Sequence, residues 1–261
     1  MSDSKTNDVL VEVNGDVMQL TLNRPDSLNA FSPEMLEGLT KAVKQANEDV
    51  GIKAILFKGS GRAFCAGGDV KQMGKRDSIT TYDHLGKTND LVMAMHHSKK
   101  PIIAAVHGFA AGAGFNLAMA ADMILAEEDT KFILSFSKVG LMSDGGGSYF
   151  MTRLVGPNRA KELLFNAEPL TAQEAYALNI VNHVYEKDKF KEEVKAFTDK
   201  IATGPSNAYE FIKKTVNQSL HSNLEDILEA ERISQATLVM TEDHQEGIQA
   251  FKEKRNPSFR I

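Results

Sequence analysis

Two glycine-rich segments of the chain carry main-chain amides that could stabilise a negative charge. They span residues 63–70 (AFCAGGDV) and 107–117 (HGFAAGAGFNL), and the second lies between an apolar run and a helical pattern. A strand that passes through small residues into a helix directs free amides and the positive end of the helix dipole at one point. Such amides can hold a phosphate or a developing oxyanion. Glycines that only allow a strand and a helix to pack closely would give the same pattern.

A third glycine-rich segment places one carboxylate where it could move a proton. Asp144 directly precedes three glycines, so few side chains crowd it. A turn or helix-capping aspartate is the alternative, because Asp-Gly pairs favour turns. The glycine spacing is neither that of a dinucleotide fingerprint nor that of a phosphate loop. The three glycines also lack the G-x-S-x-G pattern of a nucleophile elbow.

The composition argues against several classes of protein. The chain has 261 residues, a net charge of −5 and an isoelectric point near 5.8, whereas nucleic-acid surfaces need clustered positive charge. No apolar run is long enough to predict a membrane span, and the first residues lack the layout of a signal peptide. The single cysteine, Cys65, cannot form an intramolecular disulfide. We therefore expect a cytoplasmic protein without nucleic-acid or membrane partners.

No spacing of histidine, cysteine and carboxylate residues indicates a metal site. Cys65 is interpreted as a small buried hydrophobic residue, because nothing near it in the sequence indicates a lowered thiol pKa.

The elements that must position these residues follow an α/β pattern. Residues 9–22 alternate around Asn14-Gly15-Asp16, which predicts a β-hairpin. Ser32 and Pro33 predict the start of a helix. Apolar runs at residues 54–57, 101–106 and 123–125 predict buried strands. Residues 189–202, 207–220 and 224–240 predict amphipathic helices.

Taken together, these segments resemble the enoyl-CoA hydratase/isomerase (crotonase) superfamily. No single piece is decisive, but their order and spacing are specific. The matching residues are 22–25 (LNRP), 29–30, 64–69 (FCAGGD), 100–108 (KPIIAAVHG), 111–114 (AGAG), 117–118, 122, 132, 140–141, 145–146, 153–154, 247–251 and 254–255.

The resemblance implies a ClpP-like spiral of ββα turns with an acyl-CoA site over residues 1–190. It also implies a C-terminal helical region, residues 191–261, that mediates trimerisation. Trimers of this family often pair into hexamers. The expected partner is an acyl-CoA thioester, and no separate cofactor is expected because coenzyme A is part of the substrate.

The resemblance also implies roles for particular residues. The amides of Gly68 and Ala113 correspond to an oxyanion hole for the thioester oxygen. Ala66 matches a backbone contact to the adenine of coenzyme A. Gly67 and Gly114, which flank these positions, and Asn116 are also expected to contact the substrate. Arg24 matches a position that often faces the coenzyme A phosphates; a solvated surface arginine is the alternative.

The reaction is where this chain departs from the hydratases. Hydratases of the family carry catalytic glutamates at the positions that Asn116 and Phe136 occupy here. Asp144 instead matches the carboxylate position of several isomerases, including the ring-epoxide isomerases of phenylacetyl-CoA breakdown. We therefore expect an isomerase in which Asp144 moves a proton and Phe115 and Phe136 shape the acyl pocket; plain core packing is the alternative for both rings. An atypical hydratase of fatty-acid oxidation and a non-catalytic acyl-CoA-binding homologue remain the other possibilities.

Overall fold

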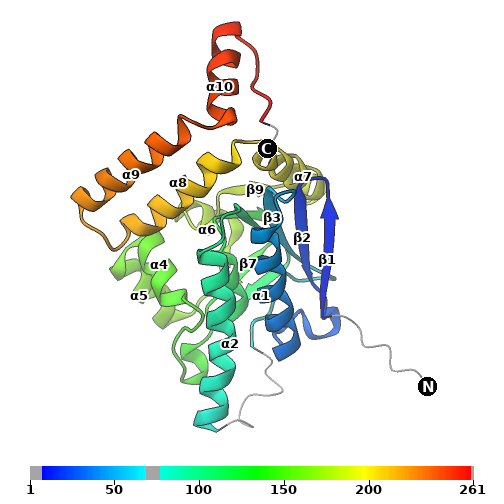
Figure 1. Ribbon diagram of the computed structural model, residues 1–261. Helices are drawn as coiled ribbons and strands as arrows, with labels where there is room; N and C mark the ends of the chain where they lie inside the picture. Colours follow the sequence, from blue (N-terminus) through cyan, green and yellow to red (C-terminus); the bar gives the residue numbers. More distant parts are fainter. Residues whose placement is uncertain (1–7, 69–76, 260–261) are drawn as a thin grey trace.

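The computed structural model describes residues 8–68 and 77–259, which form a main β-sheet, a smaller sheet and surrounding helices (Figure 1). Within those residues the main sheet has six strands in the order β1-β2-β3-β4-β6-β9. β1 pairs antiparallel with β2, and each later neighbour pairs in parallel. The strands are β1 (Val9–Asn14), β2 (Val17–Leu22), β3 (Ala54–Gly59), β4 (Ile102–Val106), β6 (Met123–Glu127) and β9 (His183–Tyr185).

The predicted hairpin and first helix are present. Gly15 has a φ of +58° at the β1–β2 turn, a conformation that glycine adopts without steric cost. Ser32 accepts a hydrogen bond from the amide of Met35, and α1 (Pro33–Glu48) begins at Pro33. The predicted strands are confirmed as β3, β4 and β6, with ends that differ by one or two residues.

A second sheet makes the chain a spiral. It contains β5 (Phe109–Ala111), β7 (Lys131–Ile133) and β8 (Leu170–Thr171), and isolated bridges join Phe31 to Gly68 and Cys65 to Ala110. Each turn thus contributes a main-sheet strand and then a second-sheet segment, as β4 is followed by β5 and β6 by β7. The predicted spiral of ββα turns is confirmed.

Helices enclose the spiral. α1 packs beside α2 (Ser78–His96), and α3 (Ala113–Met119) is followed by α4 (Gly147–Val155), α5 (Pro157–Asn166) and α6 (Ala172–Ala177). Short 3-10 turns lie at η1 (Pro25–Ser27) and η3 (Ser137–Val139). The main core lies between one face of the large sheet and these helices. Among the helices of the described residues, none is both long and apolar enough to cross a membrane.

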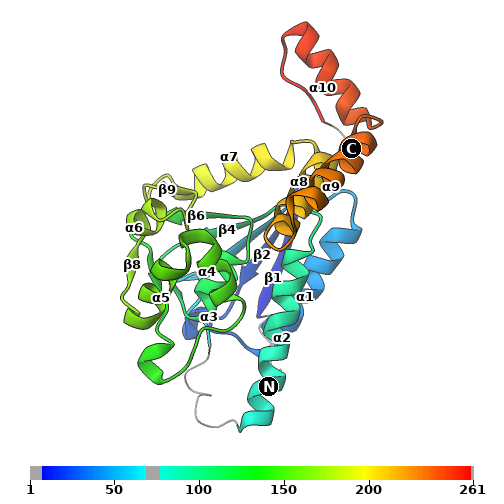
Figure 2. The ribbon, with the colours of Figure 1, turned by 90° about the vertical axis from the view of Figure 1, so that its left-hand side faces the viewer.

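The C-terminal helices divide into two groups. α7 (Phe190–Ala202) covers the other face of the main sheet, where Phe190 and Val194 pack with Val17 and Leu56. α8 (Ser206–Ser219), α9 (Leu224–Leu238) and α10 (Glu242–Glu253) follow, and α9 and α10 project away from the sheets (Figures 1 and 2). The predicted boundary after residue 190 thus falls within α7, whose apolar side belongs to the core of the sheet.

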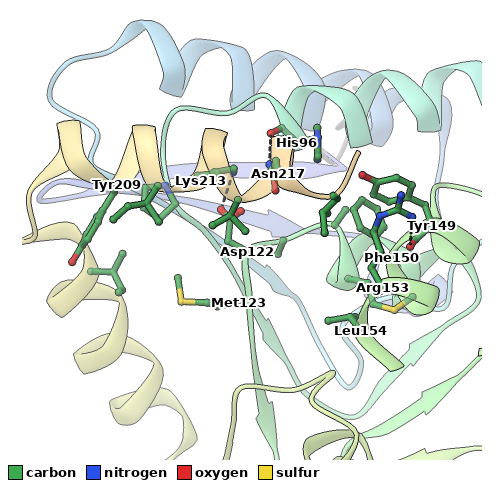
Figure 3. A pocket seen from close by; sticks show the side chains of 18 residues that line it. His96, Asp122, Met123, Tyr149, Phe150, Arg153, Leu154, Tyr209, Lys213 and Asn217 are labelled. Carbon is green, nitrogen blue, oxygen red and sulfur yellow. Dashed lines mark hydrogen bonds and ion pairs between the residues drawn. The ribbon is translucent and has the colours of Figure 1, made fainter. Parts of the chain in front are cut away.

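α8 is attached to the core by a buried ion pair. Nζ of Lys213 lies 2.7 Å from Oδ2 of Asp122, and these side chains are only 8% and 25% exposed (Figure 3). Asn217, one turn further along α8, donates to the carbonyl of His96 on α2. An apolar cavity of about 540 Å³ lies beside these contacts, between α8 and α4.

Candidate active site

The two glycine-rich segments meet at the N-terminus of α3. A Cβ atom on Gly67 would lie 2.8 Å from the amide nitrogen of Ala113 and would overlap the carbonyl oxygen of Ala111. A Cβ on Gly114 would lie 2.7 Å from Cβ of Cys65. Since real Cβ atoms do not approach other atoms this closely, both positions require glycine. The structure thus brings together the segments that the sequence singles out.

The amides of Gly68 and Ala113 have no backbone acceptor among the residues that the structure describes. The carbonyl of Gly67 accepts a hydrogen bond of 2.8 Å from the amide of Phe31. In a trans peptide the carbonyl and the next amide point in opposite directions, so the Gly68 N–H points away from Phe31. Ala113 is the first residue of α3, where an amide has no intrahelical acceptor. Neither amide donates to a backbone carbonyl among the described residues.

A buried asparagine shapes the loop that carries Gly68. Asn29 is fully buried with a φ of +56°. Its Nδ2 lies 2.8 Å from the carbonyl oxygens of Ser60 and Ala63 and 3.2 Å from that of Phe64. Its Oδ1 accepts the amide of Arg24 at 2.8 Å. Asn29 therefore joins the loop after β2 to the loop after β3, a role that its place in the family match does not reveal.

Arg24 and Ala66 lie on either side of this junction. The amide of Ala66 donates to the carbonyl of Leu28 at 2.9 Å. Nη1 of Arg24 donates to the carbonyl of Ala30 at 2.6 Å, and its Nε lies 3.6 Å from Oδ2 of Asp8. The guanidinium is thus held against the protein and only partly exposed.

Asp144 reaches the site through a contact with α3. Asn116 lies one helical turn after Ala113, and its Nδ2 donates to the carbonyl of Asp144 at 2.9 Å and to Oγ of Ser143 at 3.1 Å. Oδ1 of Asp144 is buried and accepts no hydrogen bond from the described residues. Burial raises the pKa of the Asp144 carboxyl, and the Asn116 side chain beside it acts in the opposite direction.

The glycines after Asp144 wrap around Asn116. Gly145 and Gly146 have φ values of +49° and +82°, which residues other than glycine rarely adopt. A Cβ atom on Gly147 would overlap the side chains of Asn116 and Ser143. The sequence indicated these glycines, but it did not indicate that they enclose Asn116 or that Ser143 contacts it.

The two predicted pocket phenylalanines have different surroundings. The ring of Phe136 lies 3.6 Å from the position that a Cβ atom on Gly112 would occupy, next to the start of α3. Phe115 is fully buried in the main core, and its ring centroid lies 4.9 Å from that of Phe132. Phe136 therefore borders the site, whereas Phe115 packs in the core.

The thiol of Cys65 is fully buried among backbone groups. Burial raises its pKa to about 12, although the amide of Gly67 acts in the opposite direction. Its Sγ also lies 3.1 Å from the carbonyl of Asn29, which agrees with the predicted packing role. Within the described residues, no histidine, cysteine and carboxylate side chains gather in a group that could bind a metal ion. Asp69 and Val70, at the end of the first glycine-rich segment, lie outside the described residues.

Comparisons with known proteins identify the family of the chain. The family model described as enoyl-CoA hydratase/isomerase matches residues 12–260. The chain is 35% identical to the 1,2-epoxyphenylacetyl-CoA isomerase of Escherichia coli, over 96% of this chain and 97% of that protein. It is 38% identical to a probable enoyl-CoA hydratase of Rhizobium meliloti, over 97% of each chain.

A solved structure shares the fold. The enoyl-CoA hydratase from Polaromonas sp. superposes with a TM-score of 0.93 at 31% identity, over 97% of this chain and 99% of that chain. The fold is therefore that of the crotonase enzymes. With the family model spanning nearly the whole sequence, the chain belongs to the enoyl-CoA hydratase/isomerase family.

Proposed function

We propose that this protein isomerises the double bond of an enoyl-CoA thioester, with Asp144 moving the proton. The observation that carries the proposal is one buried carboxylate oxygen on Asp144 that has no partner among the described residues, while the backbone of Asp144 is bonded to the helix that presents the Ala113 amide. The two positions where the family's hydratases have glutamates are Asn116 and Phe136 in this chain, so neither supplies a carboxylate.

The amides of Gly68 and Ala113 would act on the thioester oxygen. Removing a proton from carbon 2 of a 3-enoyl thioester leaves an electron pair that delocalises onto that oxygen. Two preorganised N–H donors stabilise the resulting dienolate more than the neutral thioester, which is what lowers the barrier. Losing one such donor costs about 10²–10³ in rate in other enzymes.

Asp144 would carry the proton between two carbons. Its carboxylate takes the proton from carbon 2, and the resulting carboxylic acid returns it to carbon 4. The double bond then lies between carbons 2 and 3, and nothing is gained or lost. Burial raises the pKa of Asp144, which makes the carboxylate a stronger base than an exposed aspartate.

The coenzyme A moiety would lie along the loop that contains Ala66. Ala66 and Arg24 border the same junction, and the guanidinium of Arg24 is partly exposed there. Coenzyme A enters as part of the substrate, so the proposed reaction requires no separate cofactor.

Hydration of a 2-enoyl-CoA is the second candidate, because several relatives are described as probable enoyl-CoA hydratases. Hydration would need a group that activates water in place of the two glutamates. A non-catalytic acyl-CoA-binding protein is the third candidate, and the preserved amides together with Asp144 argue against it.

A homotrimer, or a hexamer built from two trimers, is the proposed assembly. The projecting helices carry exposed apolar side chains, including Leu224, Ile233 and Phe251. Sedimentation of the purified protein tests this proposal: a monomer at micromolar concentration would contradict it.

The decisive experiment compares turnover of a 3-enoyl-CoA and a 2-enoyl-CoA by the wild type and Asp144→Asn. We expect the absorbance of the conjugated thioester to appear from the 3-enoyl substrate without a change in mass, and Asp144→Asn to abolish this. Addition of water to the 2-enoyl substrate, equally fast in both proteins, would overturn the proposal.

A proline substitution can test whether the main-chain amide of Ala113 is an oxyanion donor. Proline is tolerated at the first position of a helix, so Ala113→Pro removes the amide donor without breaking α3. We expect a loss of about 10²–10³ in kcat or more, because the ring also occupies space near the oxygen. Thermal unfolding close to that of the wild type confirms that α3 persists, and unchanged turnover would exclude Ala113 as a donor.

A further inference from the structure

We propose that Asn116 is a positioning residue that fixes Asp144 relative to the amide of Ala113. The proposal rests on the proposed function, in which these two groups act on one substrate. The hydrogen bonds of Asn116 run from its Nδ2 to the protein, whereas its buried Oδ1 has no partner among the described residues.

The first observation is that Asn116 locks the backbone of Asp144. The carbonyl of Asp144 accepts two hydrogen bonds, from Nδ2 of Asn116 at 2.9 Å and from the amide of Gly147 at 2.8 Å. A carbonyl oxygen has two lone pairs, so both are used. The peptide that follows Asp144 cannot rotate without breaking one of these bonds, so the backbone from which the carboxylate extends is held in place.

The second observation is that the Asn116 side chain is itself immobile. It is fully buried, and the same Nδ2 donates its other proton to Oγ of Ser143 at 3.1 Å. Gly147 lies so close that any side chain there would overlap the Asn116 amide. Asn116, Ser143 and Gly147 thus form a tightly packed bracket in which Nδ2 of Asn116 has two acceptors.

The third observation is that Asn116, the donor in this bracket, lies on the same helix as the predicted oxyanion donor Ala113. Asn116 lies three residues after Ala113 in α3, a rise of about 4.5 Å along the helix. A rigid helical turn thus separates the predicted oxyanion donor from the side chain that holds Asp144. In the proposed function, α3 would thus link the position of the thioester oxygen to that of the Asp144 carboxylate.

The charge environment agrees with this placement. Burial raises the pKa of Asp144, the Asn116 side chain lowers it, and no charged side chain of the described residues contributes to it. Loss of Asn116 should therefore raise the pKa of Asp144 further. Since the carboxylate form begins the reaction, the acidic limb of the pH profile of kcat/KM should move to higher pH.

The test compares Asn116→Leu and the isosteric Asn116→Asp with the wild type on the 3-enoyl-CoA substrate. We expect both variants to lose about 10-fold to 100-fold in kcat, because displacement of a catalytic group by 1 Å can cost that much. The acidic limb should shift to higher pH in both, and in Asn116→Asp the added carboxylate contributes to the shift by like-charge repulsion.

Asn217→Leu is the matched control. Its Nδ2 also donates to a backbone carbonyl of another helix, that of His96 at 3.1 Å, away from Asp144. We expect Asn217→Leu to leave the acidic limb of the pH profile unshifted. If the Asn116 variants also lost rate without a shift of the acidic limb, Asn116 would be a packing residue and the inference would be overturned. Activity that survives in Asp144→Asn would instead refute the proposed function, whichever way the Asn116 variants behave.

Discussion

The ion pair that attaches α8 to the core gives the sharpest stability prediction. In Lys213→Met, the carboxylate of Asp122 keeps the amide of Ile102 at 2.7 Å and loses its cation. The ammonium also donates to the carbonyls of Met95 at 3.0 Å and Lys100 at 3.3 Å, so two further acceptors lose a donor. The variant thus leaves an uncompensated, largely buried charge.

The size of the effect follows from burial. Removing one partner of a buried pair typically costs about 3–5 kcal/mol. Because a quarter of the Asp122 side chain is exposed, water recovers part of this, and we expect a loss of about 2–3 kcal/mol of unfolding free energy at pH 7.5. Burial raises the pKa of Asp122 and Lys213 holds it down, so the variant's carboxyl has a higher pKa still. A carboxyl whose pKa is higher in the folded state than in the unfolded state lowers stability as pH rises above its unfolded-state pKa. The loss of unfolding free energy in Lys213→Met should therefore be smaller near pH 5 than at pH 7.5.

The assay is urea unfolding at a fixed protein concentration, since any assembly makes stability depend on concentration. Asp122→Asn in the Lys213→Met background removes the charge but keeps an acceptor for Ile102, and should recover part of the loss. A loss below about 1 kcal/mol at both pH values, with no recovery in the double variant, would show that the pair is solvated as surface pairs are.

Three further predictions concern the site. Gly67→Ala should abolish turnover and lower the melting temperature, since the new Cβ would lie 2.8 Å from the amide nitrogen of Ala113; a normal rate and melting curve would refute this packing. Asp144→Asn should unfold at higher urea than the wild type at pH 7.5, because burial raises the pKa of Asp144 and its charge costs stability above that pKa. This gain should vanish near pH 4, and a pH-independent difference would contradict the argument. Cys65, with a pKa of about 12, should resist iodoacetamide in the native protein and react after unfolding, as mass spectrometry would show; native labelling would refute its burial.

Sequence patterns were sufficient for the elements whose signals are local. The β1–β2 hairpin has alternation and a glycine turn, and Ser32 with Pro33 starts α1, because caps and turns depend on residues a few positions apart. α2 was not predicted, since only its second half is buried and its first turns lack an apolar stripe. α10 was also missed, and its Phe251 is 86% exposed.

The candidate site was only partly predictable, for a physical reason. The glycines stand out because they permit backbone conformations and close approaches that other residues do not, and Asp144 stands out as a carboxylate directly before three of them. The bracket around Asn116 depends on a contact between residues 116 and 143–147, and Asn29 joins positions more than 30 residues apart. No spacing rule along the chain encodes such contacts, so they required the fold.

The spiral has a consequence for what the site can hold. Gly68 and Ala113 each lie three residues beyond the bridged pair of Cys65 and Ala110, and so occupy equivalent corners of successive turns. Neighbouring strands are about 4.8 Å apart, and a donor lies about 2.9 Å from its acceptor. Two N–H donors held at that strand spacing would converge on a single oxygen at an angle of about 110°, close to that between the lone pairs of a carbonyl. If the Gly68 and Ala113 amides act as proposed, the spacing of successive turns of the spiral would set the angle between them, whatever side chains surround the site.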